Sequence, residues 1–154
     1  MNEKEVIADF QFLGSRVVKL LIETKPLKEK SRAELTVDFD YETNKLVQEN
    51  NIFIGGIRLI ILIKAKIKNK VLFKIDLVME GAFSGDSEKM TKEKFTEMVE
   101  RNGLITLMHL SRAFLIGVSA QSGINPPIRI PMINITKLRE SKQKSLTEGN
   151  NDGL

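Results

Sequence analysis

Two hydrophobic periodicities divide the chain. In the first half, apolar and polar positions alternate in several runs, which is typical of strands with one buried face. Helical spacing begins only after about Ser87 and continues through the second half. This order of strands followed by helices favours an α+β fold in which the helices are segregated from the sheet.

Four strands are predicted from the alternation, over residues 10–23, 35–41, 56–68 and 71–80. In the first strand, Gly14 marks the expected site of a bulge, because glycine weakens a ladder but permits a kink. Asn69 turns the chain between the last two strands, so these form a long hairpin. The outward side of that hairpin is partly aliphatic, and such residues need either a cover or a binding partner.

The helical half begins at Thr91, and Asn102-Gly103 predicts a stop or a kink in a long helix that ends near Gln121. After residue 103 its apolar side chains point in nearly every direction, whereas a surface helix shows one stripe. A single sheet covers only one side of such a helix, so the other side is expected to meet another copy of the chain. The predicted oligomer interface comprises Leu104, Leu107, Met108, Phe114 and Gly117.

The segment after this helix is extended, because Pro126, Pro127 and Pro131 disfavour helix. A short amphipathic helix is predicted over residues 135–144, and residues 145–154 are expected to be a disordered polar tail. The chain is therefore predicted to be a single domain over residues 1–144.

Composition excludes several classes of protein. The chain of 154 residues has no cysteine and one histidine, so thiolate metal sites, thiol nucleophiles and disulfides are excluded. Its net charge of +4 is spread over both signs, so no nucleic-acid partner is predicted. The start of the chain lacks the basic and apolar regions of a signal peptide, which favours the cytoplasm. Polar residues interrupt the most apolar helical stretch, residues 104–118, so no membrane insertion is expected.

Three candidates for chemistry are weaker than their structural alternatives. His109 has no second histidine or carboxylate spaced to orient it, so a packed or surface histidine is favoured. Asp38 and Asp40 share a strand face and are explained by solvation, as are the alternating lysines at positions 64–70. No catalytic residue, metal site or cofactor is predicted.

Residues 112–138 (RAFLIGVSAQSGINPPIRIPMINITKL) resemble the SecB export chaperones. The shared features are Arg112 in the long helix, a glycine-proline turn at residues 123–127, an extended apolar segment, Pro131 with Asn134, and a short closing helix. The run from Gly81 to Ser84 also resembles the end of the family's last strand.

The resemblance implies a four-stranded antiparallel sheet with a long kinked helix and a short C-terminal helix on one face, assembled as a homotetramer, a dimer of dimers. It also implies an ATP-independent holdase that keeps unfolded or pre-secretory polypeptides soluble, with a translocation motor or an antitoxin as further partners. The alternatives are an oligomeric adaptor or structural subunit for one fixed protein partner and, more weakly, an enzyme with a pocket between sheet and helices. The predicted client-binding residues are Leu20, Ile22, Ile60, Leu62, Leu72, Val78, Ile128 and Ile130.

Overall fold

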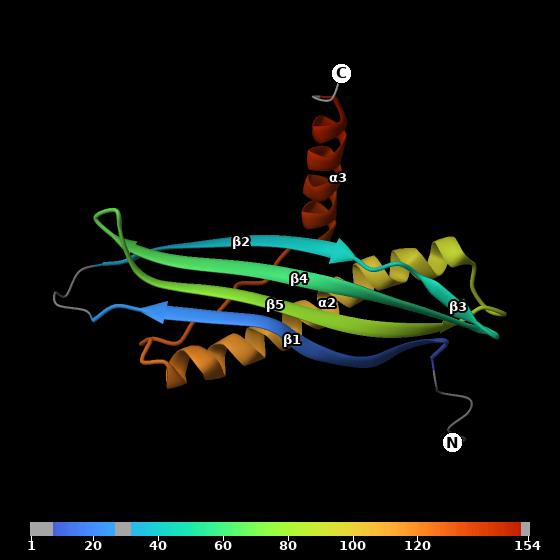
Figure 1. The fold of residues 1–154 in the computed structure, drawn as a ribbon, viewed down its shortest axis with the longest axis horizontal. Helices are drawn as coiled ribbons and strands as arrows, with labels where there is room; N and C mark the ends of the chain where they lie inside the picture. Colours follow the sequence, from blue (N-terminus) through green and yellow to red (C-terminus); the bar gives the residue numbers. More distant parts are fainter. Residues whose placement is uncertain (1–7, 27–31, 152–154) are drawn as a thin grey trace.

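One antiparallel sheet and two helices make up the part of the chain described by the computed structural model, residues 8–26 and 32–151. The strands are β1 (Phe10–Thr24), β2 (Glu34–Thr43), β3 (Val47–Glu49), β4 (Ile52–Ile67) and β5 (Lys70–Asp86). Their order is β1-β5-β4-β2, and β3 pairs with the first residues of β4. The helices α2 (Lys92–Gln121) and α3 (Ile135–Asn151) follow, so the α+β class is confirmed (Figure 1).

The β4–β5 hairpin is the centre of the sheet. Its two-residue turn places Lys68 and Asn69 at φ 49° and 66°, the left-handed conformation that such hairpin turns require. The sheet has five strands where four are predicted, because Asn50, at φ 54°, starts a second tight turn that adds β3 to β4. A strand of three residues is too short to show an alternating pattern in the sequence.

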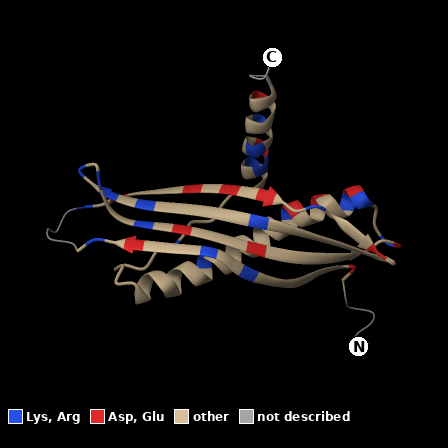
Figure 2. Cartoon of the chain, in the orientation of Figure 1, with Lys and Arg blue, Asp and Glu red and all other residues tan. Residues whose placement is uncertain are grey.

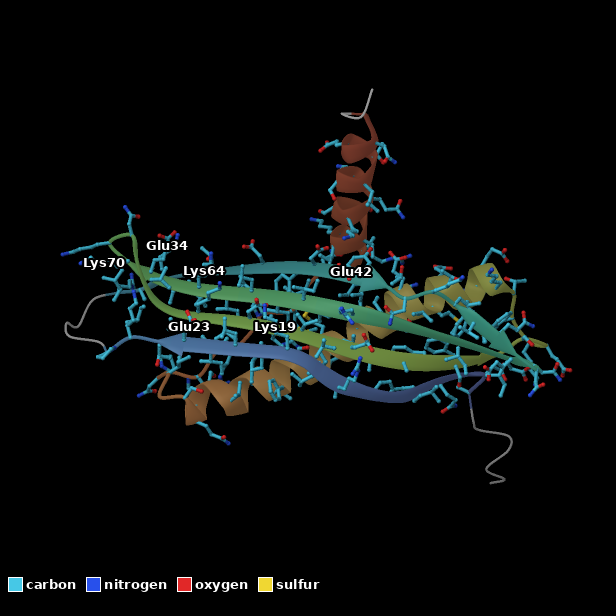
Figure 3. The ribbon with its side chains drawn as sticks, viewed as in Figure 1. Lys19, Glu23, Glu34, Glu42, Lys64 and Lys70 are labelled. Carbon is cyan, nitrogen blue, oxygen red and sulfur yellow. The ribbon has the colours of Figure 1, made fainter. Side chains whose placement is uncertain are left out.

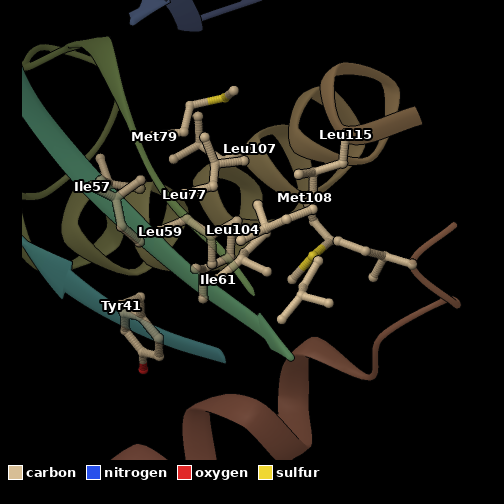
Figure 4. Packing of buried hydrophobic residues seen from close by; sticks show 14 of the residues in the cluster. Tyr41, Ile57, Leu59, Ile61, Leu77, Met79, Leu104, Leu107, Met108 and Leu115 are labelled. Carbon is tan, nitrogen blue, oxygen red and sulfur yellow. The ribbon is translucent and has the colours of Figure 1, made fainter. Parts of the chain in front are cut away.

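The two faces of the sheet have different environments. On the face that we call inner, alternate side chains of β4 and β5 are fully buried under α2, which crosses behind the sheet in Figure 1. Figure 4 shows these side chains meeting Leu104, Leu107 and Leu115 of the helix. The opposite face, which we call outer, has no helix over it in the described part of the chain. The inner side chains of β4 and β5 that are 0% exposed are Ile57, Leu59, Ile61, Ile63, Ile75 and Leu77.

The long helix α2 begins at a capped turn and is helical through Asn102-Gly103, where the sequence predicts a stop or a kink. Its N-cap Thr91 accepts a hydrogen bond from the Lys94 amide through its hydroxyl, at 3.1 Å. A Cβ at Gly103 would lie 2.9 Å from Ile57 Cγ2. The glycine therefore lets α2 lie close to the sheet, and its role is packing rather than helix termination.

The segment after α2 is fastened to the same helix. Gly123, at φ 80°, follows the helix end as the sequence predicts. Arg112 Nε then donates to the Ile130 carbonyl at 2.8 Å, and its Nη2 donates to the Pro131 carbonyl at 2.9 Å. The Ile128 amide donates to the Ser119 hydroxyl at 2.8 Å. Arg112 therefore holds the extended segment that the family resemblance identifies.

Helix α3 starts beside β2 and projects away from the sheet (Figure 1). Arg139 and Lys142 connect its first turns to Glu100 and Asp40 at 3.0 and 2.9 Å, whereas residues 143–150 are exposed. The prediction of a disordered tail from residue 145 is wrong for residues 145–151, which continue the helix because no proline interrupts it. Residues 152–154 lie outside the described part.

Candidate functional site

An aliphatic patch lies at the centre of the outer face, which neither helix of the described residues covers. Ile60 of β4 is opposite Val78 of β5, and Leu62 is one pleat further along β4. Leu21 of the edge strand β1 is opposite Asp76, and its side chain is 36% exposed. These four side chains, which we call the outer patch, are half-buried or exposed. Aliphatic side chains on an uncovered sheet face are candidates for contact with a partner.

A row of charged residues flanks the outer patch on one side. Arg58 donates to Glu80 Oε2 at 2.9 Å through Nη2, and Arg16 donates to Glu80 Oε1 at 3.2 Å through its own Nη2. The hydrogen bonds from Arg58 are the main reason why the pKa of Glu80 lies below its ordinary value, although burial opposes the shift. Glu42 is opposite Arg58 and continues the row onto β2, so the signs alternate across the sheet (Figure 2).

The opposite side of the patch is more basic, with Lys64 and Lys74 paired across β4 and β5. Lys19 and Glu23 of β1 and Lys64 of β4 appear on the face turned to the viewer in Figure 3. Lys19 Nζ lies 2.8 Å from Asp76 Oδ2, so this carboxylate already has a partner. Asp76 lies between Leu21 and Leu62, and Lys19 lies beside Val78, so the outer patch contains this ion pair and is flanked by charged rows of both signs.

Strand β2 bounds the patch with carboxylates. Asp38 is opposite Leu62 and Asp40 is opposite Ile60. Lys142 of α3 pairs with Asp40, whereas Asp38 is exposed, as predicted for a solvated face. Within the described residues, no group of three or more His, Asp or Glu side chains is placed to hold a metal ion.

Three of the predicted client-binding residues, Ile60, Leu62 and Val78, lie together in the outer patch. Leu20 and Ile22 are not with them, because they are opposite Leu77 and Ile75 on the inner side. A register shift between Val17 and Lys19 inserts an extra residue, and a one-residue insertion moves every later side chain to the other face. Leu20 and Ile22 are therefore not part of the outer patch, although Leu20 is 38% exposed, and Leu21 takes their place on that face.

The remaining predicted client-binding residues are elsewhere. Leu72 lines a crevice of about 430 Å³ together with Phe73 and Ile124, at the end of α2. Ile128 and Ile130 are 6% and 4% exposed and belong to the core, so a client cannot contact them in this structure. The sequence predicts the extended segment correctly, but it does not reveal that hydrogen bonds with Arg112 and Ser119 hold this segment against α2.

The residues of the predicted oligomer interface do not lie on one surface. Leu104, Leu107 and Met108 are at most 3% exposed because they pack on the inner face of their own sheet, so their assignment to the interface is wrong. Phe114 is half-buried against the core. Gly117 is exposed, and a Cβ there would meet no atom within 4 Å. The apolar residues on the uncovered side of α2 are Ile105, Leu110, Ala113, Gly117 and Ala120.

A polar cluster beneath the sheet joins three elements. The Tyr41 hydroxyl donates to Glu100 Oε1 at 2.7 Å, and Arg139 Nε donates to the same oxygen at 3.0 Å. Burial, together with the hydrogen bond to Glu100, raises the pKa of Tyr41 above its ordinary value. Tyr41 and Arg139 both donate to Glu100, so the cluster connects β2, α2 and α3. This arrangement fits a structural role better than a catalytic one.

Comparison with known proteins gives a likeness of structure without one of sequence. No model of a protein family matches the chain, and no curated protein matches it by sequence. The fold is that of a SecB-like chaperone. A SecB-like chaperone from Mycobacterium tuberculosis, solved in complex with a peptide from the HigA1 antitoxin, superposes with a TM-score of 0.61 at 14% identity, over 82% of this chain and 91% of that one.

A protein of unknown function from Streptococcus agalactiae superposes with a TM-score of 0.48 at 10% identity, over 80% of this chain and 97% of that one. The resemblance to SecB-like proteins inferred from residues 112–138 is confirmed at the level of the fold.

Proposed function

We propose that the chain is an ATP-independent chaperone that binds unfolded or pre-secretory polypeptides through the outer patch and keeps them soluble. The observation that carries this proposal is the group formed by Leu21, Ile60, Leu62 and Val78 on the sheet face that α2 and α3 leave uncovered. Aliphatic contact does not require one pattern of hydrogen bonds, so such a patch suits varied clients. The charged rows on both sides keep the patch soluble when it is empty.

The proposed assembly is a homotetramer, a dimer of dimers, located in the cytoplasm. Its support is the apolar side of α2 that the sheet does not cover, which beyond the middle of the helix includes Leu110, at 37% exposed. Gly117 and Ala120 on that side would let two helices approach closely. A translocation motor stays a proposed further partner.

The test replaces both Ile60 and Leu62 by serine and measures suppression of aggregation of several unrelated denatured proteins, together with native mass. We expect the double variant to keep its mass and to lose most of the suppression, because its apolar contact is removed. The matched control changes Glu42 and Lys64 to glutamine on the same face and should keep the activity. Unchanged suppression in the serine variant would contradict the role of the patch.

A second candidate function is an adaptor that binds one fixed protein partner, such as an antitoxin. It is favoured by the structural neighbour, which was solved with an antitoxin peptide. The same panel of denatured proteins separates the two functions. A chaperone suppresses the aggregation of several of them, whereas an adaptor suppresses none and still binds its own partner.

A further inference from the structure

A second surface, separate from the outer patch, has a composition of its own. It is a crevice of about 300 Å³ between the middle of α2 and the segment that leads into α3, and we call it the α2 crevice. It lies on the helix side of the molecule, whereas the outer patch lies on the opposite face of the sheet. The two surfaces can therefore be altered independently.

The ionisable side chains that line the α2 crevice all belong to basic residue types. Arg101, His109 and Arg112 contribute to it, and none of its lining residues is Asp or Glu. Arg112 donates only to the neutral carbonyls of Ile130 and Pro131, and a guanidinium has further N–H donors. Within residues 8–26 and 32–151, neither arginine is in an ion pair. The crevice therefore carries positive charge without a carboxylate partner.

The nearest acidic residues along α2 do not remove this charge. Glu100 accepts hydrogen bonds from Tyr41 and Arg139 and does not line the crevice. Glu97, one turn before Arg101, lies 3.9 Å from Lys94. A carboxylate brought in by a ligand would thus gain charge-assisted hydrogen bonds with arginine donors that have no anionic partner.

The rest of the crevice is apolar and open. Ile105 and Ile133 form part of its lining, and Met132 at its mouth is 79% exposed, the highest value among the large apolar side chains described. Methionine is flexible and adapts to differently shaped ligands. The volume is at the lower end of the range for ligand pockets, about 300–1,000 Å³, so it holds a side chain rather than a long hydrocarbon tail.

We propose that the α2 crevice binds an acidic and apolar segment of a partner polypeptide. One aliphatic side chain of the segment packs between Ile105, Met132 and Ile133, and a neighbouring carboxylate of the segment accepts hydrogen bonds from Arg101 and from the unused donors of Arg112. The choice of a polypeptide as partner rests on the proposed function. The selectivity for acidic residues rests on the crevice alone.

The experiment uses the full chain and three fluorescent pentapeptides that differ only in the central residue, with aspartate, asparagine or lysine between two leucines. Fluorescence anisotropy gives the dissociation constants. We expect the aspartate peptide to bind about tenfold more tightly than the asparagine peptide, which corresponds to one charge-assisted contact. The lysine peptide should bind most weakly, and added salt should reduce the differences between the three.

Variants locate the binding. Arg101→Gln should remove most of the preference for aspartate, Arg101→Lys should keep part of it, and Met132→Ser should weaken binding of all three peptides alike. Arg129→Gln is the matched control, because Arg129 is exposed on the same segment but does not line the crevice. Equal affinity for aspartate and asparagine, or a preference unchanged by Arg101→Gln, would overturn the proposal.

Two further outcomes decide between occupants. If Arg101→Gln or Met132→Ser lowers the native mass and no peptide binds, the crevice belongs to an interface between copies of this chain and the proposal is overturned. Suppression of aggregation is measured on the same variants. A variant that no longer binds the peptides but still suppresses aggregation would support the crevice as a separate site. If the wild-type chain prefers the aspartate peptide but does not suppress aggregation, only the proposed chaperone function is rejected.

Discussion

Ile60 and Ile61 are neighbours on β4, but the two faces of the sheet put them in different environments. Ile61 is 0% exposed and lies opposite Leu77 under α2, as Figure 4 shows. Ile60 lies opposite Asp40 and Val78 on the outer face, which α2 does not cover. The same side chain therefore contributes to stability on the inner face and is available for contact with a partner on the outer face.

The largest expected effect compares these two residues directly. Ile61→Ala should lower the free energy of unfolding by about 2–5 kcal/mol, because it leaves a cavity under the helix. Ile60→Ala should lower it by less than about 1 kcal/mol, since water already reaches that side chain. Urea denaturation of both variants measures the difference, and equal losses would contradict the distinction between the faces.

Two glycines extend the comparison to the helix. Gly103→Ala should cost about 1–3 kcal/mol, because its Cβ would lie 2.9 Å from Ile57 Cγ2 and 3.2 Å from Phe83 Cε2. Within one chain a Cβ at Gly117 meets no atom within 4 Å, so Gly117→Ala should stabilise the helix of a dissociated protomer by about 0.5–1 kcal/mol, whereas in the proposed assembly it should weaken the contact between helices. Thermal unfolding of dissociated protomers should show a lowered melting temperature for Gly103→Ala and a raised one for Gly117→Ala. A loss of stability at Gly117 would show that a second chain packs there.

Tyr41 tests the boundary between the inner face and α3. Tyr41→Phe should cost about 1 kcal/mol because it removes the hydrogen bond to Glu100. Tyr41 is the chain's one tyrosine and there is no tryptophan, so its ionisation can be followed by absorbance alone. Its pKa is raised in the folded protein, so this stabilisation is complete below the ordinary tyrosine pKa of 10.0 and declines as pH rises above it. Ionisation near pH 10 in folded protein would contradict the buried hydrogen bond.

The smallest effect belongs to the charged row of the outer face. Glu80→Gln should change stability by less than about 1 kcal/mol at neutral pH, because the arginine partners of Glu80 are partly exposed. The pKa of Glu80 is lowered in the folded state, so its contribution is present above the ordinary value of 4.5 and is lost as pH falls below it. Denaturation from pH 7 to pH 3 should therefore show a shallower loss for the variant. A steeper loss would contradict the lowered pKa.

Local sequence signals predicted much of the fold because they act within a few residues. The alternation in β2, β4 and β5, the turn at Asn69 and the end of α2 at Gly123 agree with the structure. The expected bulge at Gly14 is also present, since the register shifts between Phe12 and Gly14. Each of these features depends on backbone preferences that one or two residues express wherever they occur.

The candidate site was only partly predictable. Ile60, Leu62 and Val78 share a face because a hairpin register follows from its turn. Leu20 and Ile22 were assigned to the wrong face because no residue type near Val18 signals the second bulge of β1. The α2 crevice itself was not predicted, because Arg101 and Arg112 come together with Met132 only when the extended segment folds back along the helix.

The sequence by itself determined the α+β class, the long hairpin and the SecB-like pattern of residues 112–138, because periodicity and turn chemistry are local properties. Only the tertiary structure decided which side of α2 is buried. The apolar residues of α2 point almost all round the helix, so its own pattern does not choose a side. The close approach at Gly103 and the fastening of Ile128 and Ile130 by Ser119 and Arg112 make that choice, since packing depends on contacts between residues far apart in the chain.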